Sequence, residues 1–346
     1  MRSSLQNSQK LTITDGTAAY RKLRQIVEKQ GILDRDYGYY TLLTLFAFSG
    51  FFYSAYNIVI TPTSLQLLLW CVLFAFFTIQ IGGILHDAGH KAIFNSTKYN
   101  NILGTLCGIF ITMSYNEWNF THNKHHAHTN QEDEDPDLEL PLHAFTKRQF
   151  LRQKGIWKML RRHQAYIFYP LRILTVFTRR WDDVKYFMRE KRIGVLWEVP
   201  FWIIGISILY IVPFFLFDVT KAIFVLFFVN LATGFYMSNI FAPNHKGMPQ
   251  PPKDIKISFL EHQVITSRNI SGHWLTDFIY LGLNYQIEHH LFPNCPRNKL
   301  KRITPHVLAI CKEMHLAYTQ VSILESNRII LAELQKIAQL PDENKS

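Results

Sequence analysis

The sequence has few charged residues and few cysteines for its length. Charged residues make up 18% of the 346 residues, below the roughly 25% that is usual for soluble domains. The four cysteines are scattered and none forms a CxxC pair, which argues against a disulfide framework, a zinc ribbon or a cysteine-held iron–sulfur cluster. No GxGxxG motif occurs, so the usual strand–turn–helix site for a nicotinamide or flavin cofactor is not expected.

Hydrophobic residues are abundant instead, at 48% of the chain, and the formal net charge is +11. A basic balance can indicate nucleic acid binding when the charge lies on a folded polar surface. Here the basic segments alternate with long apolar stretches. An anionic membrane face or a phosphate-bearing substrate therefore suits this charge better, and no nucleic acid partner is expected.

Four long apolar runs are candidate membrane spans. They cover about residues 39–60, 65–85, 195–217 and 222–242. Each run is long enough to cross roughly 30 Å of hydrocarbon, and the short turns at 61–64 and 218–221 join the runs into two hairpins. Residues 101–113 are also apolar but too short to cross, and we expect an interfacial or re-entrant segment there. Residues 1–38 are polar and of mixed charge, which rules out an ordinary cleaved signal peptide.

The basic residues lie almost entirely on one side of these spans. The segments before the first span, between the second and third, and after the fourth hold 36 of the 37 Lys and Arg residues. The remaining one, Lys221, falls in a short outer turn. The positive-inside rule then predicts that both termini and the large central loop are cytosolic.

Histidines gather in three clusters with helical spacing. HDAGH at 86–90 contains an i, i+4 pair, and HNKHH at 122–126 contains an i, i+3, i+4 set. QIEHH at 286–290 has Gln286 where a third histidine would complete the same spacing, and His245 stands alone after the fourth span. Side chains at these spacings share one face of a helix. One such pair arises by chance, but three clusters on one predicted side of a membrane indicate a shared metal site.

The candidate ligands are too many for one tetrahedral zinc ion. The eight histidines are His86, His90, His122, His125, His126, His245, His289 and His290. Two ions are therefore implied, although imidazole suits iron, copper, zinc and nickel alike. Nearby acids are candidates to orient the ring N–H groups, namely Asp87, Asp133, Asp135, Asp137 and Glu288. An acidic run such as 131–139 is, however, also typical of a solvated surface.

We expect an all-α membrane protein with four transmembrane helices in two hairpins and a cytosolic helical cap that holds a di-metal site. The predicted organisation is a cytosolic segment at 1–38, a membrane domain at 39–318, and a C-terminal amphipathic helix and tail at 319–346. Apolar residues share one face of the predicted helix over 320–340, namely Ile323, Ile330, Leu334 and Ile337. This pattern predicts a helix that docks on the polar part of the chain.

The three histidine boxes resemble those of the membrane fatty-acid desaturase superfamily. HDAGH, then HNKHH followed by TNQEDEDPD, then NYQIEHHLFP agree with that family in order, spacing and position relative to the spans. The resemblance covers residues 40–318. The third box with its Gln, together with PNHKGMP at 243–249 and ITSRNI at 265–270, is similar to the front-end and linoleoyl-type branch.

The resemblance implies two iron ions, molecular oxygen as co-substrate, and removal of two hydrogens from an acyl chain to leave a cis double bond. It implies that the eight histidines are iron ligands, with Gln286 as a further metal ligand in the place of a histidine. The acyl carrier stays open between acyl-CoA, acyl-carrier protein and acyl-lipid. Many front-end members carry a fused cytochrome b5 domain marked by HPGG, which these 346 residues lack. We therefore leave the double-bond position open and expect a separate electron donor, a reductase with ferredoxin or cytochrome b5.

Two other functions are open at this point. A hydroxylase or monooxygenase of the same superfamily would share the histidine boxes, but the QIEHHLFP box favours a desaturase. A membrane metal transporter would need polar or ionisable groups at mid-membrane depth, and the four runs hold no charge there. Asn230 is the notable polar residue near the centre of a run, and we expect it to bond to a neighbouring helix.

Overall fold

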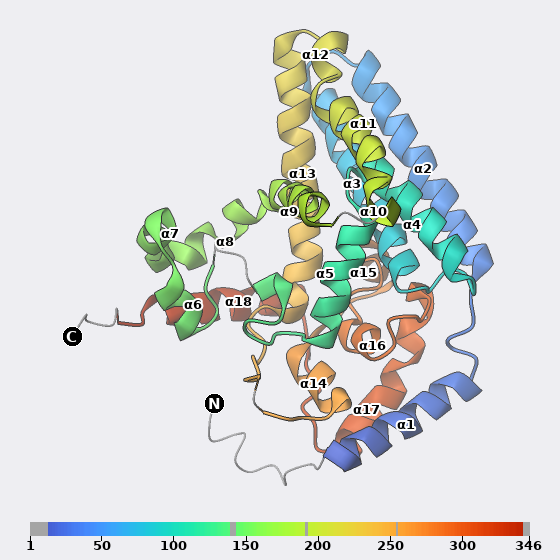
Figure 1. Ribbon diagram of the computed structural model, residues 1–346, viewed down its shortest axis with the longest axis vertical. Helices are drawn as coiled ribbons and strands as arrows, with labels where there is room; N and C mark the ends of the chain where they lie inside the picture. Colours follow the sequence, from blue (N-terminus) through green and yellow to red (C-terminus); the bar gives the residue numbers. More distant parts are fainter. Residues whose placement is uncertain (1–12, 139–142, 191–192, 254, 342–346) are drawn as a thin grey trace. The chain divides into compact units, whose positions relative to one another are not determined.

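The computed structural model describes residues 13–138, 143–190, 193–253 and 255–341, and most of them lie in helices (Figure 1). The chain forms two compact units, each discontinuous in sequence. Unit 1 comprises residues 1–34, 122–166 and 240–346, and unit 2 comprises residues 35–121 and 167–239. The expected helical class holds, apart from one small parallel sheet in unit 1 that pairs β1 (Asn269–Ile270) with β2 (Gln320–Val321).

The first two apolar runs form a helical hairpin in unit 2. Helix α2 (Tyr37–Ile60) follows the N-cap residue Asp36, and α3 (Leu65–Gly89) follows the N-cap residue Ser64. Each cap side chain accepts a hydrogen bond from a backbone amide of the first helical turn, which satisfies one of the donors that a helix start leaves unpaired. The two helices pack against each other, so the short turn between them closes a hairpin.

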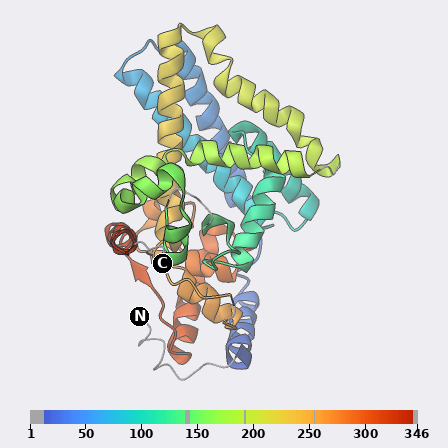
Figure 2. The ribbon, with the colours of Figure 1, turned by 60° about the vertical axis from the view of Figure 1, so that its left-hand side comes forward.

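The third apolar run is divided into several helices. Residues 195–217 fall into α10 (Ile193–Leu196), α11 (Glu198–Tyr210) and α12 (Pro213–Leu216). Pro213 has no amide hydrogen with which to continue α11, and it takes the first-turn position of α12 instead. Figures 1 and 2 both show α12 at the point where the chain turns from α11 into the next long helix.

Among the described residues, three helices are long and apolar enough to cross a membrane: α2, α3 and α13 (Val219–His245). They coincide with the predicted spans at 39–60, 65–85 and 222–242. The span predicted at 195–217 has no counterpart of that length, since α11 has 13 residues. Helix α3 also continues beyond its predicted end and includes His86 within its last turn.

Helix α13 is packed closely within unit 2. Val229 lies in a buried cluster with Ile58 of α2 and Cys71 of α3. The Asn230 side-chain oxygen accepts a hydrogen bond of 2.7 Å from the Tyr210 hydroxyl of α11, so the expected bond between Asn230 and a neighbouring helix is confirmed. Gly234 allows α13 to lie close to the backbone of Ile173, because a Cβ at position 234 would be only 2.2 Å from the carbonyl oxygen of Ile173.

The core of unit 1 is built by four helices. They are α1 (Ile13–Lys29), α14 (Phe259–Thr266), α16 (Gln286–Leu291) and α17 (Thr304–Glu313). Leu23 and Val27 of α1 pack with Leu260 of α14, Ile287 of α16 and Val307 of α17. The polar N-terminal segment expected over 1–38 therefore contains a helix with an apolar face, and this helix is part of the core that carries the third histidine box.

The C-terminal amphipathic helix is α18 (Ile323–Ala338). Ile330, Leu334 and Ile337 are buried, as predicted, whereas Ile323 is half-exposed. The Gln164 side-chain amide donates 2.9 Å to the Leu334 carbonyl. The other short helices of unit 1 are η1 (Pro136–Leu138), α6 (Lys147–Arg152), α7 (Gly155–Leu160), η2 (Arg161–His163), α15 (Trp274–Ile279) and η3 (Arg297–Arg302). Helix α18 thus docks on unit 1. Unit 2 also holds α4 (Thr97–Ile111), most of α8 (Gln164–Arg172) and α9 (Thr175–Arg189).

The contact at Gly234 gives a test of this packing. Gly234→Ala should lower the free energy of unfolding by roughly 1–3 kcal/mol, because a methyl group has no space beside the Ile173 backbone. The apparent unfolding temperature of the detergent-solubilised protein measures the loss. Gly82→Ala is the matched control, since a Cβ there meets its nearest atom, on Ile111, at 3.6 Å. Equal unfolding temperatures for the two variants would contradict the prediction.

Candidate metal centre

The second histidine box lies on α5 (Tyr115–Ala127), whose first turn is held by buried polar groups. The Ser114 hydroxyl accepts from the Glu117 amide at 3.1 Å and donates to Glu198 at 2.6 Å. The Glu117 carboxylate in turn accepts 2.7 Å from Arg179. Carboxylates at a helix N-terminus pair with its free amides and with its dipole. The helix that carries HNKHH therefore begins at a defined place.

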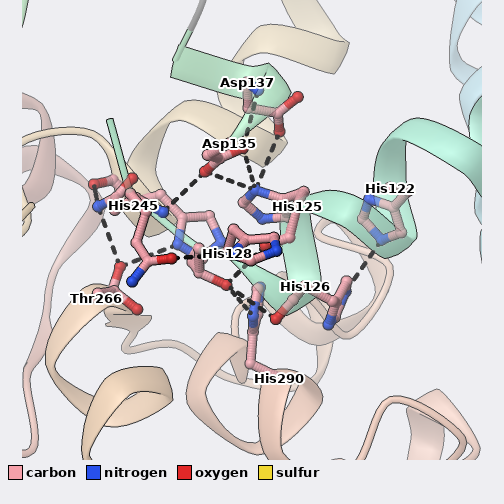
Figure 3. A network of polar contacts seen from close by, with 12 residues as sticks. His122, His125, His126, His128, Asp135, Asp137, His245, Thr266 and His290 are labelled. Carbon is pink, nitrogen blue, oxygen red and sulfur yellow. Dashed lines mark hydrogen bonds and ion pairs between the residues drawn. The ribbon is translucent and has the colours of Figure 1, made fainter. Parts of the chain in front are cut away.

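Three imidazoles converge in unit 1 (Figure 3). His125 comes from α5, His245 from the last residue of α13 and His290 from α16. One ring nitrogen from each lies within 4.8 Å of the others, and their exposed fractions are 3%, 7% and 1%. Three segments that are far apart in sequence thus place three ligand-type nitrogens around one buried point.

Each of these rings is held by a hydrogen bond from Nδ1 to a buried acceptor. The pairs are His125 with the Asp135 carboxylate at 2.9 Å, His245 with the Thr266 carbonyl at 3.1 Å, and His290 with the Gln263 side-chain oxygen at 2.8 Å. The Gln263 amide nitrogen donates to the His126 carbonyl at 3.0 Å, which fixes the orientation of that amide. All three acceptors require a proton on Nδ1, so Nε2 of each ring keeps its lone pair.

The surroundings shift the pKa of His125 and that of His290 in opposite directions. Burial alone would lower the pKa of His125, but the carboxylates of Asp135 and Asp137 raise that pKa above its ordinary value. Burial and the neighbouring imidazoles lower the pKa of His290 well below its ordinary value. The cluster therefore cannot carry a second proton, and with it a positive charge, on every ring, and a metal cation shared among neutral imidazoles suits it better.

The donor set fits a metal ion. Nε2 of His290 is buried and has no hydrogen-bond partner among the described residues, which is costly for a lone pair unless a ligand takes it. Nε2 of His122 lies 3.1 Å from Nε2 of His126. Two metal–nitrogen bonds of about 2.1 Å at right angles would separate the nitrogens by about 3 Å. The ring centroids of His126 and His289 are 4.9 Å apart, so the second and third boxes place neighbouring imidazoles within unit 1.

The first box lies in unit 2, at the end of α3. The rings of His86 and His90 are 4.7 Å apart, as their i, i+4 spacing predicts. Nδ1 of His86 lies 3.1 Å from an Asp87 oxygen, and the other Asp87 oxygen accepts 2.7 Å from the Tyr40 hydroxyl. Asp87 therefore contacts one ring of the first box and links it to α2 through Tyr40.

The acidic residues near the boxes have different partners. Asp135 binds His125 directly, and an Asp137 oxygen lies 3.7 Å from the same Nδ1. Asp133 instead pairs with Arg148 and Arg152, which draws its carboxylate toward these basic side chains.

Glu288 is also engaged away from the rings. Its carboxylate accepts 2.7 Å from the Asn269 amide and 2.8 Å from the Tyr318 hydroxyl. Burial raises its pKa, and these two donors partly offset the effect. Glu288 therefore ties α16 to β1 and to the segment before β2.

The sequence did not predict that Gln263 and Thr266 accept hydrogen bonds from the histidine rings. Each lies more than 20 residues from the histidine that it holds, so no spacing within one helix indicates the contact.

The end of α13 is held by Arg268 of the ITSRNI segment. Arg268 is fully buried, and its guanidinium donates to the carbonyl oxygens of Pro243 and Lys246 at 2.6 to 2.9 Å. Its backbone amide donates 2.8 Å to the Asn244 carbonyl. A cation at the C-terminus of a helix is favoured by the free carbonyls and the dipole there. Arg268 thus fixes the turn that presents His245.

The Asp135 contact leads to a testable expectation. Asp135→Asn should lower metal affinity by about 10–100-fold, since an outer partner of a ligating histidine typically contributes that much. Metal per chain after dialysis against graded chelator, measured by mass spectrometry, reports the change. Asp133→Asn removes the same charge two residues away without touching a histidine, and it should bind metal as the unmodified chain does. If both variants lose metal equally, Asp135 has no special role.

The fatty acid desaturase family model matches residues 62–322, three quarters of the chain. The chain is 26% identical over 352 residues to a Delta 8-(E)-sphingolipid desaturase of Emericella nidulans, covering 92% of this chain and 62% of that protein. It is also 26% identical to Delta(8)-fatty-acid desaturase 2 of Arabidopsis thaliana and to a Delta(6)-fatty-acid desaturase of Caenorhabditis elegans. Those two matches cover 94% and 93% of this chain, and 76% and 75% of the relatives. The chain therefore belongs to the fatty acid desaturase family.

Proposed function

We propose that this chain is an oxygen-dependent fatty-acyl desaturase that forms a cis double bond at a histidine-held di-iron centre. The observation that carries the proposal is the buried set of His125, His245 and His290, each with Nδ1 bonded to an acceptor and Nε2 left to bind metal. The support from the comparisons is that the relatives are named as fatty-acid and sphingolipid desaturases. A lipid acyl chain is accordingly the expected substrate.

Other functions have less support. A hydroxylase or monooxygenase of the same superfamily would use the same ligands and differ in its product, and the names of the relatives favour desaturation. A metal transporter would need ionisable groups at the middle of its spans. Helices α2, α3 and α13 have acidic or basic residues only near their ends, Asp87 in α3 and Lys221 in α13.

The proposed ligands are the eight histidines of the three boxes and α13, with Gln286 in the position of a further histidine. Unit 1 supplies six of them: His122, His125, His126, His245, His289 and His290. His86 and His90 are proposed to complete the set, with support from their spacing, the 4.7 Å between their ring centroids and the Asp87 contact with His86. Iron rather than zinc is proposed because desaturation needs a redox-active metal.

The protein's contribution to the reaction is placement and exclusion of water. An unactivated methylene has no acidic proton, so general acid–base catalysis cannot remove its hydrogens, and bound iron would supply the oxidising chemistry. Asp135, Gln263 and Thr266 hold the Nδ1 protons and aim the Nε2 lone pairs. Burial of these rings keeps bulk water from the site and strengthens each of these polar contacts.

Electrons must reach the site from outside these 346 residues. Reducing oxygen to two waters takes four electrons and four protons. The acyl chain supplies two of each as its two C–H bonds break and the double bond forms. The other two electrons are proposed to come from a reductase with ferredoxin or cytochrome b5, because the sequence has no GxGxxG, HPGG or clustered cysteines. Acidic carriers would be steered by exposed basic residues such as Lys301 and Arg302.

We also propose the membrane arrangement that the charges predict. Helices α10, α11 and α12 together would form the remaining crossing, and both termini and the histidine boxes would face the cytosol. The support is that 36 of 37 Lys and Arg residues lie outside the short turns. The division into segments 1–38, 39–318 and 319–346 stays a prediction, while α1 and α18 both pack within unit 1.

The reaction is tested by reconstitution. Purified chain with an acyl substrate, oxygen, NADPH, a reductase and a small carrier should give a cis-unsaturated product two hydrogens lighter than its precursor, with two irons per chain. His126→Ala should lose both iron and activity. Mass spectrometry and metal analysis measure these outcomes.

Three results would count against this proposal. A product one oxygen heavier without a double bond would identify a hydroxylase. Full iron and turnover in His126→Ala would remove the second box from the ligand set. Sustained turnover with NADPH but no added carrier protein would contradict an external donor.

The topology is tested by reporters. A reporter fused after Ser346 should be active only when it senses the cytosol, and the same reporter inserted in the turn at 61–64 should give the opposite signal. Both fusions are compared in cells that show desaturation, which confirms that they fold. Matching signals from the two positions would refute the hairpin.

A further inference from the structure

Asn130 lies in the loop between the second histidine box and Asp135, and its side chain contacts the end of α13. The residue is 1% exposed, and its backbone φ of +55° is in the left-handed region. Glycine and asparagine adopt this conformation more readily than other residues. An asparagine here could therefore serve the turn alone, or its amide could have a role that glycine cannot supply.

The backbone of Asn130 supports the acceptor that holds the His125 ring. Its amide donates 2.8 Å to one oxygen of Asp135, and the Asp137 amide donates 2.9 Å to the other oxygen. The same carboxylate accepts the Nδ1 proton of His125 at 2.9 Å. Two backbone donors of the loop therefore fix the carboxylate that orients this ring.

The side chain of Asn130 reaches the acceptor that holds the His245 ring. Its Nδ2 lies 3.0 Å from the His245 carbonyl oxygen and 3.4 Å from the carbonyl oxygens of Pro249 and Thr266. The Thr266 carbonyl also accepts the Nδ1 proton of His245. Carbonyl oxygens only accept hydrogen bonds, so the amide must present its NH2 group to these three. No ring nitrogen takes part, and a bound metal leaves this orientation unchanged.

A second contact holds the other end of the same loop. Nζ of Lys246 donates 2.7 Å to the Asp137 carbonyl and lies 5.5 Å from the centre of the Phe145 ring. The loop from Asn130 to Asp137 is thus bonded to the end of α13 near both of its ends. Loss of the Asn130 side chain should therefore loosen the start of the loop without releasing the whole of it.

We propose that Asn130 is a positioning residue that places the rings of His125 and His245 correctly for one shared metal ion. The inference rests on the di-iron centre proposed above. The two rings come from different helices, α5 and α13, and each is oriented by its own acceptor. Asn130 bonds to Asp135 through its backbone and to the His245 and Thr266 carbonyls through its side chain. A shift of one ring relative to the other would break these hydrogen bonds.

The test compares glycine at two positions of this loop in the iron-loaded, full-length enzyme. Asn130→Gly keeps the left-handed backbone and its bond to Asp135, and it removes only the side-chain contacts. Asp133→Gly is the matched control, because position 133 has a φ of +67° and its side chain pairs with Arg148 and Arg152. Both variants make the unfolded chain more flexible to the same extent, so that effect cancels between them.

A chelator titration, with iron per chain measured by mass spectrometry, gives the first result. Asn130→Gly should release one iron at about 10-fold lower chelator concentration, the lower end of what an outer partner of a ligand contributes. Its second iron, and both irons of Asp133→Gly, should be released as in the unmodified chain. Unchanged release from Asn130→Gly would overturn the proposal. Equal weakening of both irons would also overturn it, since a general folding role affects both sites.

Asn130→Asp gives the same decision if the glycine variant does not accumulate. Aspartate has nearly the same size and tolerates the same backbone, but an ionised carboxylate cannot donate to carbonyl oxygens. Its negative charge alone would strengthen the binding of a cation, so weaker binding of one iron would support the role of the amide donor. Iron binding as tight as in the unmodified chain, or tighter, would overturn that role.

A measurement on the metal-free chain separates this inference from the proposed function. Amide hydrogen exchange over residues 243–249 should rise in Asn130→Gly and stay unchanged in Asp133→Gly, because the Asn130 side chain bonds to that segment. Equal exchange in the two variants would count against the inference, whatever the metal content. Absence of iron or of double-bond formation in the unmodified chain, beside the expected exchange, would count against the di-iron desaturase alone.

Discussion

The hydrogen bond from Nδ1 of each central imidazole to a buried acceptor is the interaction on which the proposed metal centre depends. Without it a ring could rotate or place its proton on the wrong nitrogen, and Nε2 would not be available. Two of the acceptors, Gln263 and Thr266, belong to α14. That helix is positioned by the core in which Leu260 packs with α1, α16 and α17. Packing away from the histidine cluster therefore determines which nitrogen of these rings carries the proton.

Much of the fold follows from local patterns. The uncharged runs at 39–60, 65–85 and 222–242 predict α2, α3 and α13, because apolar length alone is a strong signal. The run at 195–217 has the same composition, but a proline near its end divides it, and hydropathy does not register that break. Helix α1 was not predicted, since its apolar face is narrow and its mean composition is polar.

The site was predictable where spacing within one helix carries the information. HNKHH and HDAGH specify which rings share a face, and the family indicated by the boxes is confirmed by the family match over 62–322. Partners from distant segments were not predictable. Four arginines illustrate this, since each binds a partner within its own unit: Arg161 the Phe150 carbonyl, Arg162 the end of α18, Arg179 the Glu117 carboxylate and Arg180 the Asn230 side chain. A single sequence shows that an arginine is present but not what it contacts.

The distance in sequence between the boxes has a consequence for biosynthesis. His125 and its anchor Asp135 are translated early, whereas His290 follows about 160 residues later. At the usual pace of the ribosome this interval lasts roughly 10–30 s. During most of that time five of the eight histidines exist without the other three, and any metal they captured would be held by fewer bonds. Metal loading is therefore expected to be a late event, after the third box has joined α1 and α14 in the core.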